Sequence, residues 1–284
     1  MVRWVVGAGR VLTNEEHTLV MGVLNVTPDS FSDGGQFLAF DAAVAHGVQM
    51  TVDGADLIDV GGESTRPGSE AVPAAVEVDR VVPVIRALSR EGVVVSIDTS
   101  KAEVAAAAVA AGAVVINDVT ALSDPEMASL AAAAGVGVVL MHMQGTPRTM
   151  QADPHYDDVV AEVTGFLVDR VAAAGAVGVE RDRIALDPGV GFGKNLAHNL
   201  ALLGRGVLQL AETGHPVLIG ASRKSFLERI LGSLPPEDRD LPTVAAHALA
   251  IANGAAIVRV HNVVMGTRSA RVADAIVRGQ DISR

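Results

Sequence analysis

The chain has 284 residues, of which 49% are hydrophobic, 3% are aromatic and none is cysteine. Its 33 acidic and 22 basic residues give a formal net charge of −11, which argues against non-specific nucleic-acid binding because such binding needs a basic surface. The lack of cysteine excludes disulfides, zinc–thiolate sites, iron–sulfur clusters and thiol nucleophiles. We expect a soluble, cytoplasmic protein, because no apolar stretch is long enough for a signal sequence or a membrane span.

Eight short apolar runs recur along the chain, and each is followed by a polar cluster and then by an Ala-rich segment. Nearly continuous hydrophobicity within a run is typical of a strand that is buried on both faces, as in a parallel sheet. The predicted strands are 19–24, 57–60, 93–97, 114–116, 137–141, 183–186, 216–219 and 256–260.

The segments that follow these strands have helical periodicity. The predicted helices are 41–53, 74–89, 101–111, 124–134, 159–174, 196–212, 243–253 and 267–277. Eight strand–helix repeats in this length predict an α/β fold, a (β/α)8 TIM barrel in which residues 1–284 form one domain. An open doubly wound sheet is the alternative, because the number of strands does not prove closure. We also expect a short N-terminal hairpin at 2–11 over the bottom of the barrel, and a loop at 235–242.

A polar or charged side chain follows every predicted strand, and barrel active sites are built at these C-terminal strand ends. Any one of them, such as Asp98 or Asn117, can be interpreted as a helix N-cap, but a complete ring is unusual in a structural protein. The carboxylates and carboxamides suit the edge of a flat heterocycle, and the cations suit a phosphate or diphosphate joined to it. The ring comprises Asn25, Arg66, Asp98, Asn117, His142, Asp187, Ser222, Lys224, Arg259 and His261.

A series of motifs in the same chain is similar to the dihydropteroate synthase family of pterin-binding enzymes. Residues 21–35 and 58–68 resemble its two long signatures, and shorter matches follow in family order at 96–101, 116–119, 141–144, 187–194, 220–224 and 259–261. The resemblance implies an enzyme of folate biosynthesis that uses Mg2+. Such an enzyme joins 6-hydroxymethyl-7,8-dihydropterin diphosphate to 4-aminobenzoate and releases 7,8-dihydropteroate and diphosphate.

The resemblance also implies a role for individual residues. The pterin would be held by Asp98, Asn117, Asp187 and Lys224, with Arg259 stacked on its face and Met141 lining the slot. The diphosphate would meet Asn25, Arg66, Arg259 and His261, with the Asn25 amide oxygen as a ligand of Mg2+. The 4-aminobenzoate pocket, which is also the expected sulfonamide site, would comprise Phe31, Thr65, Arg66, Pro67, Phe192 and Ser222.

The family suggests a dissociative mechanism, in which the bond to diphosphate breaks before the weakly nucleophilic aryl amine attacks. Mg2+, Arg66, Arg259 and His261 would stabilise the departing charge, and Asp98 would stabilise the pterin cation. The loops at 27–37 and 64–71 are expected to close over the bound diphosphate.

One residue departs from the family pattern, because Asn262 follows His261 where the family usually has Asp. The loss of an adjacent carboxylate would change how His261 is oriented or charged, with a modest effect on activity. The family is typically dimeric, and the late Ala- and Leu-rich helices would form the interface of a homodimer.

Two other functions are compatible with the same barrel. A methyltetrahydrofolate-dependent methyltransferase would not need the segments 65–67 and 222–224, and both are present. A non-catalytic pterin-binding paralogue would be expected to have lost part of the anion or aminobenzoate site, which is intact here.

Overall fold

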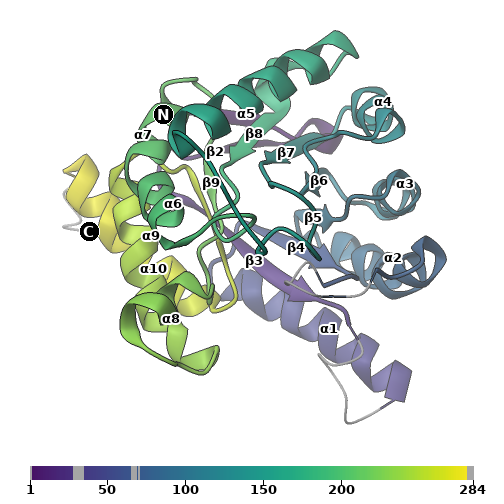
Figure 1. Ribbon diagram of the computed structural model, residues 1–284. Helices are drawn as coiled ribbons and strands as arrows, with labels where there is room; N and C mark the ends of the chain where they lie inside the picture. Colours follow the sequence, from purple (N-terminus) through teal and green to yellow (C-terminus); the bar gives the residue numbers. More distant parts are fainter. Residues whose placement is uncertain (1, 28–34, 65–68, 70, 280–284) are drawn as a thin grey trace.

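The computed structural model describes residues 2–27, 35–64, 69 and 71–279. Within these ranges, eight parallel strands form a central sheet, and helices surround it (Figure 1). The strands are β3 (Leu19–Asn25), β4 (Leu57–Gly61), β5 (Val95–Asp98), β6 (Val115–Asp118), β7 (Gly137–Met141), β8 (Ile184–Asp187), β9 (Leu218–Ile219) and β10 (Ile257–Val260).

The sheet closes on itself. Its hydrogen-bonded order is β8-β7-β6-β5-β4-β3-β10-β9, and a parallel bridge between Leu186 and Val217 joins β8 to the residues that enter β9. The backbone N–H of Leu186 also donates to the carbonyl of Pro216 at 2.8 Å. This closure confirms the (β/α)8 barrel and excludes the open doubly wound sheet.

The outer layer is helical. Its α-helices are α1 (Gly35–Val52), α2 (Ala74–Arg90), α3 (Ala102–Ala111), α4 (Pro125–Ala134), α5 (Val159–Ala176), α6 (Leu196–Ala201), α7 (Val207–Ala211), α8 (Phe226–Leu231), α9 (Asp240–Ala252) and α10 (Val263–Arg278).

The predicted helix at 196–212 contains a π-helical turn at Leu202–Gly206, and α8 was not predicted. The predicted loop at 235–242 is wrong in its second half. Helix α9 begins at Asp240, and Pro242 is tolerated in a first turn because no helical hydrogen bond is lost there.

Side chains alternate between two apolar clusters along each strand. On β4, Ile58 and Val60 belong to the cluster under the helices, whereas Leu57 belongs to a smaller cluster inside the barrel. The inner cluster also holds Leu19, Val115, Val139, Ala185, Leu218 and Ile257, which lie near the N-terminal ends of their strands. The inward positions nearer the C-terminal ends are therefore left for polar side chains.

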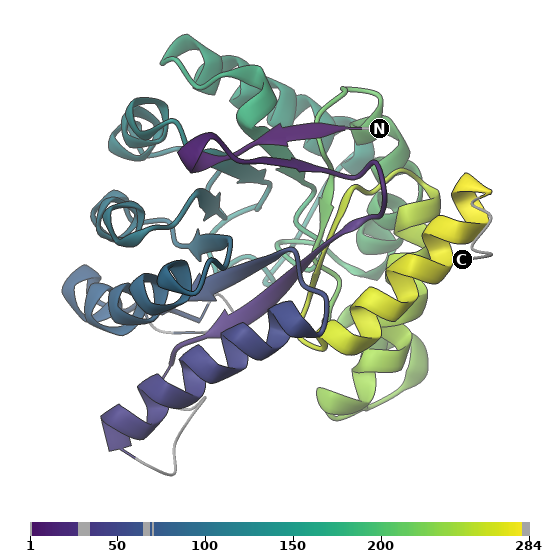
Figure 2. The same cartoon turned by 180° about the vertical axis from the view of Figure 1, so that it is seen from behind.

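The predicted N-terminal hairpin is confirmed. Strand β1 (Arg3–Val5) pairs antiparallel with β2 (Val11–Thr13), and the hairpin crosses the barrel in the view from behind (Figure 2). Trp4 is fully buried in the inner cluster, and its Nε1 donates to the carbonyl of Arg183 at 2.8 Å. Because Arg183 directly precedes β8, the hairpin seals the end of the barrel opposite the C-terminal strand ends.

Candidate active site

The described residues of the predicted ring gather at the C-terminal strand ends. They are Asn25 on β3, Asp98 on β5, Asn117 on β6, His142 just after β7, Asp187 on β8, Arg259 on β10, and Ser222, Lys224 and His261 just after β9 and β10. Met141, predicted to line the slot, is the last residue of β7. Phenylalanine 192 follows β8 in the turn before α6. The predicted Phe31, Thr65, Arg66 and Pro67 lie outside the described residues, as does most of the two loops that were expected to close.

A single guanidinium links two carboxylates across the barrel interior. The Nε of Arg259 donates to Oδ2 of Asp59, and its Nη2 donates to Oδ2 of Asp98, both at 2.6 Å. The same Asp59 oxygen accepts a hydrogen bond from Nδ2 of Asn117 at 2.9 Å. Burial alone would lower the pKa of Arg259, but Asp59 and Asp98 raise it above its usual value, so this arginine stays charged.

Asp98 has an unusual protonation equilibrium. Burial raises its pKa to about 7, although Arg259 pulls the pKa down and Asp59 adds to the rise. Its side chain is 11% exposed, and its Oδ1 has no hydrogen-bond partner. The carboxylate therefore has one buried oxygen whose hydrogen-bonding capacity is not used within the protein.

Neither Asp98 nor Asn117 is a helix cap. The N-cap position of α3 is Lys101, and that of α4 is Asp124, whose side chain accepts the backbone N–H of Glu126. The helix-cap interpretation of the two ring residues is therefore wrong, and their side chains are instead linked to each other through Asp59 and Arg259.

Asp187, Lys224 and Arg259 converge on Gly220. A Cβ atom added at Gly220 would lie 3.9 Å from Oδ2 of Asp187, from Nζ of Lys224 and from Cβ of Arg259. Burial raises the pKa of Asp187, while the nearby Lys224 opposes the rise. Burial lowers the pKa of Lys224 to about 8, against the pull of Asp187. An acceptor and a donor thus share one polar slot.

Phe192 forms one wall beside this slot. The Nζ of Lys224 lies 4.4 Å from the centroid of the Phe192 ring and donates to the carbonyl of Val190. Met141 is 3% exposed at the end of β7. Apolar surface therefore flanks the charged groups, as a flat aromatic ligand requires.

Ser222 and His261 are tied together. The Ser222 Oγ accepts the backbone N–H of His261 at 3.1 Å and lies 3.0 Å from its Nδ1. Asn262 is the N-cap of α10, because its Oδ1 accepts the backbone N–H of Met265 at 3.1 Å. Its Nδ2 donates to Oδ2 of Asp240 at 3.1 Å.

The oxygen atoms near Asn25 and Asp98 suit a Mg2+ ion that has few protein ligands. A Cβ at Gly61 would lie 3.8 Å from both Oδ1 of Asn25 and Oδ2 of Asp98, so an amide oxygen and a carboxylate oxygen flank the same backbone position. Among the described residues, no three His, Asp or Glu side chains gather as a metal site. Mg2+ binds oxygen and commonly keeps several waters and substrate phosphates, so the residues present fit this ion.

Two residues of the site were missed from the sequence. Asp59 lies within the apolar strand predicted at 57–60 and was not identified as a site residue. A carboxylate within such an apolar run is itself an indication of a functional residue. Lys194 is 2% exposed, and its Nζ bonds Nδ1 of His142 at 2.9 Å, the His142 carbonyl at 3.1 Å and the Phe192 carbonyl at 2.9 Å. It anchors the turn after β8 to the end of β7, which no spacing in the sequence indicates.

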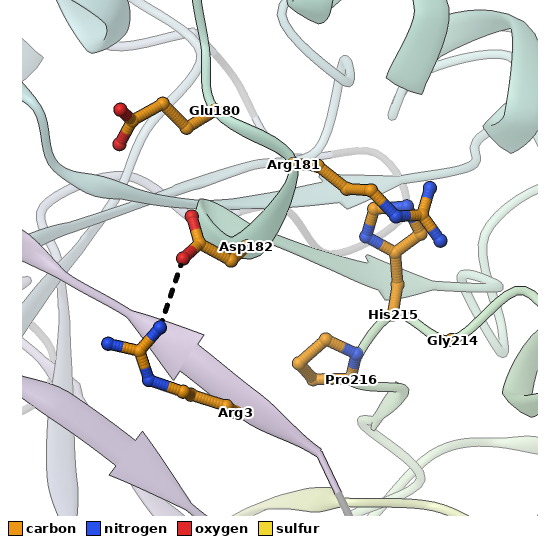
Figure 3. Close-up of a pocket in the computed structure, with 7 residues that line it drawn as sticks. All are labelled: Arg3, Glu180, Arg181, Asp182, Gly214, His215 and Pro216. Carbon is orange, nitrogen blue, oxygen red and sulfur yellow. Dashed lines mark hydrogen bonds and ion pairs between the residues drawn. The ribbon is translucent and has the colours of Figure 1, made fainter.

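A cavity of about 380 Å3 lies on the opposite side of the barrel, beside the hairpin (Figure 3). It is lined by Arg3, Glu180, Arg181, Asp182, Gly214, His215 and Pro216. Arg3 pairs with Asp182 at 3.3 Å, Glu180 pairs with Arg183 at 2.7 Å, and Arg181 donates to the carbonyl of Thr213. Because each of these four charged side chains already has a partner within the protein, the polar slot at the C-terminal ends is the better candidate active site.

Comparisons with known proteins identify the family of the chain. The family model described as Pterin binding enzyme matches residues 21–261. The dihydropteroate synthase of Escherichia coli (strain K12) is 45% identical over 272 residues, which cover 94% of this chain and 95% of that protein. The enzyme of the same name from Mycobacterium leprae is 49% identical over 252 residues, which cover 86% and 88%.

Solved structures give the same result. Dihydropteroate synthase from Xanthomonas albilineans with 4-aminobenzoic acid superposes with a TM-score of 0.89 at 49% identity, covering 96% of this chain and 97% of that one. The Yersinia pestis enzyme with a sulfonamide drug gives 0.90 at 43% identity, covering 96% and 98%. The chain therefore belongs to the pterin-binding enzyme family and, within it, to the dihydropteroate synthases, which are transferases of folate biosynthesis.

Proposed function

We propose that this chain condenses 6-hydroxymethyl-7,8-dihydropterin diphosphate with 4-aminobenzoate to give 7,8-dihydropteroate and diphosphate. The observation that carries the proposal is the convergence of Asp187, Lys224 and Arg259 on Gly220. Relatives in this family have been solved with 4-aminobenzoic acid and with 7,8-dihydropteroate. The polar slot has the donors and acceptors that these two molecules need.

The pterin edge fits the slot group by group. The Asp187 carboxylate accepts from a ring N–H and from the exocyclic amine, and such charge-assisted pairs are strong. Lys224 donates to the ring carbonyl oxygen and the neighbouring nitrogen. The planar guanidinium of Arg259, held by two carboxylates, stacks on the ring face. Asn117 and Asp98 complete the edge.

The reaction proceeds by early loss of diphosphate. Asn25 would hold Mg2+ with its amide oxygen, and the ion, when bound, would supply charge neutralisation to the diphosphate. His261, Arg66 and the outer face of Arg259 stabilise the departing oxygens. Asp98, with an unpartnered Oδ1, lies where it stabilises the positive charge that develops on the pterin.

The second substrate binds against the pterin site. Phe192 and Ser222 form the described part of the 4-aminobenzoate pocket, and the family resemblance assigns Phe31, Thr65, Arg66 and Pro67 to the same pocket. The tie between Ser222 and His261 couples the carboxylate end of this pocket to the anion site. Sulfonamides, which mimic 4-aminobenzoate, bind in the same pocket.

The protein works as a cytoplasmic homodimer. Helices α9 and α10 lie next to each other on the outside of the barrel (Figure 1). They carry exposed apolar side chains, with Leu241 70%, Leu249 67% and Ile276 77% exposed. Among the described helices, none is long and apolar enough to span a bilayer. Light scattering should give the mass of two chains for the wild type and of one chain for Ile276→Asp; a monomeric wild type refutes the dimer.

The activity is tested with purified protein, Mg2+, the dihydropterin diphosphate and 4-aminobenzoate, following diphosphate release and the mass of dihydropteroate. Product should require both substrates and disappear in Asp187→Ala. The matched control is Asp182→Ala, which removes an aspartate at the opposite end of the barrel and should leave turnover unchanged. Pterin binding without turnover supports the non-catalytic paralogue instead.

A further inference from the structure

A carboxylate below the polar slot holds two of its members from behind. Asp59 lies inside the barrel on β4, and its side chain is fully buried. In the strand register, Asp59 is opposite Ser96, whereas Asn117 is opposite Asp98, two residues further along β5. Asp59 thus lies one layer below the residues that form the mouth of the slot. One of its oxygens accepts two hydrogen bonds, and the other has no partner.

This contact decides which end of the Asn117 amide faces a ligand. An amide group has a donor end and an acceptor end, whereas an ionised carboxylate only accepts. The end of Asn117 that meets Asp59 is therefore its NH2 group, at 2.9 Å. Its oxygen is left on the other side, as an acceptor for the N–H groups of a heterocycle edge.

The same carboxylate sets the plane of Arg259. Hydrogen bonds from Nε to Asp59 and from Nη2 to Asp98, each 2.6 Å long, fix the guanidinium at two points. A planar group held at two points on its edge presents its face in one orientation. Without Asp59, the guanidinium would be held by Asp98 alone and could turn about that contact.

We propose that Asp59 is a positioning residue of the pterin site, which presents the acceptor end of Asn117 and the face of Arg259 to the pterin without touching it. The inference rests on the proposed function of the slot as a pterin site. It assigns to the buried Asp59 a role that neither Asp98 nor Asp187 fills.

The experiment measures binding of 6-hydroxymethylpterin to the full chain by calorimetry, since this probe has the pterin edge and no diphosphate. Asp59→Ala should weaken binding by about 10- to 100-fold, the range expected for lost hydrogen bonds to a charged group. Asp59→Asn should stay within about fivefold of the wild type, because its amide oxygen can take the place of Oδ2 and accept both hydrogen bonds. Asp59→Leu, similar in shape and without an acceptor, gives the same test if the alanine variant does not fold.

Kinetics separate positioning from general destabilisation. In Asp59→Ala, the KM for the dihydropterin diphosphate should rise while the KM for 4-aminobenzoate stays unchanged. The matched control is Ser96→Ala, because Ser96 is a fully buried neighbour in the register whose Oγ has no hydrogen-bond partner. This control should bind the pterin like the wild type.

A double-variant cycle tests the route through Asn117. Because Asp59 also holds Arg259, the losses in Asp59→Ala and Asn117→Ala should add only in part in the double variant. Full additivity, or pterin binding by Asp59→Ala that equals that of Ser96→Ala, overturns the inference. Failure of the proposed function has a different signature, since the wild type would then bind no pterin and Asn117→Ala would change nothing.

Discussion

The strongest test of the network behind His261 is the change Asn262→Asp, which introduces the residue that the family resemblance predicts at this position. In this chain the Asn262 amide donates to Oδ2 of Asp240 at 3.1 Å. Asp240 also receives two hydrogen bonds from Arg223, at 2.6 and 2.8 Å. An aspartate at 262 would replace the donor by a second carboxylate at the same distance. We expect the variant to be less stable than the wild type.

The size of the loss follows from three contributions. The hydrogen bond to a charged acceptor is worth about 1.5–3 kcal/mol. Repulsion between two carboxylates 3–4 Å apart adds up to about 4 kcal/mol at a partly exposed site, and outward rotation of the new side chain relieves most of it. A negative N-cap on α10 returns about 0.3–1 kcal/mol. The expected net loss is about 1–3 kcal/mol, a fall in Tm of about 2–9 °C for a chain of this size.

Calorimetry at pH 7.5 and at pH 4 measures this loss and its cause. The Tm difference between Asn262→Asp and the wild type should shrink at pH 4, because protonation of either carboxylate restores a donor. Asn262→Ala, which removes the cap and the hydrogen bond without adding charge, should show a difference that changes little with pH. A difference for Asn262→Asp that is equal at both pH values, or a more stable variant, refutes the reasoning. Turnover should fall only modestly, since Ser222 still holds His261.

Three further changes probe other parts of the molecule. Burial raises the pKa of Asp98 from 3.8 to about 7. The contribution of Asp98 to stability is therefore full below pH 3.8 and is lost as the pH rises through 7. In Asp98→Asn, the unfolding free energy measured by urea titration should depend less on pH over that interval than in the wild type. Gly189→Ala should abolish activity and lower Tm, because φ is +68° and the new Cβ would lie 1.9 Å from the carbonyl oxygen of His142. Gly178→Ala, with φ of +98° and its nearest neighbour at 3.8 Å, should cost only about 1–2 kcal/mol, and equal losses in the two variants would contradict the steric account. Trp4→Ala should cost about 3–5 kcal/mol while leaving kcat/KM unchanged at 25 °C, because the side chain seals the far end of the barrel.

Much of the barrel could be predicted because its signal is local. A short apolar run that ends at a polar cluster indicates a buried strand, and the run predicted at 183–186 is found as β8 at Ile184–Asp187. The polar ring followed from the same pattern, since the residue after each strand is read directly from the chain. The helical start of α9 was missed because Pro235, Pro236 and Pro242 resemble a loop, although a proline in a first turn fits a helix.

The contacts inside the site could not be predicted, because their partners are far apart in sequence. Arg259 and Asp59 are separated by 200 positions, and Arg259 and Asp98 by 161. Lys194 reaches back 52 positions to His142. Only closure of the barrel brings such pairs together. A pattern along the chain therefore indicates which residues are polar but not which of them are paired.

The pairing matters for the chemistry because it leaves the pterin site short of positive charge. Asp59 and Asp98 share one guanidinium, so ionisation of both carboxylates leaves a formal excess of one negative charge around Arg259. Burial raises the pKa of Asp98 to about 7 in the free protein, and the negative charge of Asp59 adds to this rise, while Arg259 opposes it. Under the proposed mechanism, loss of diphosphate creates a positive charge on the pterin ring. The low dielectric that makes Asp98 hard to ionise then strengthens its attraction to that cation. The site thus favours the charged intermediate over the neutral ring, which is the condition for catalysis by a fixed electrostatic environment.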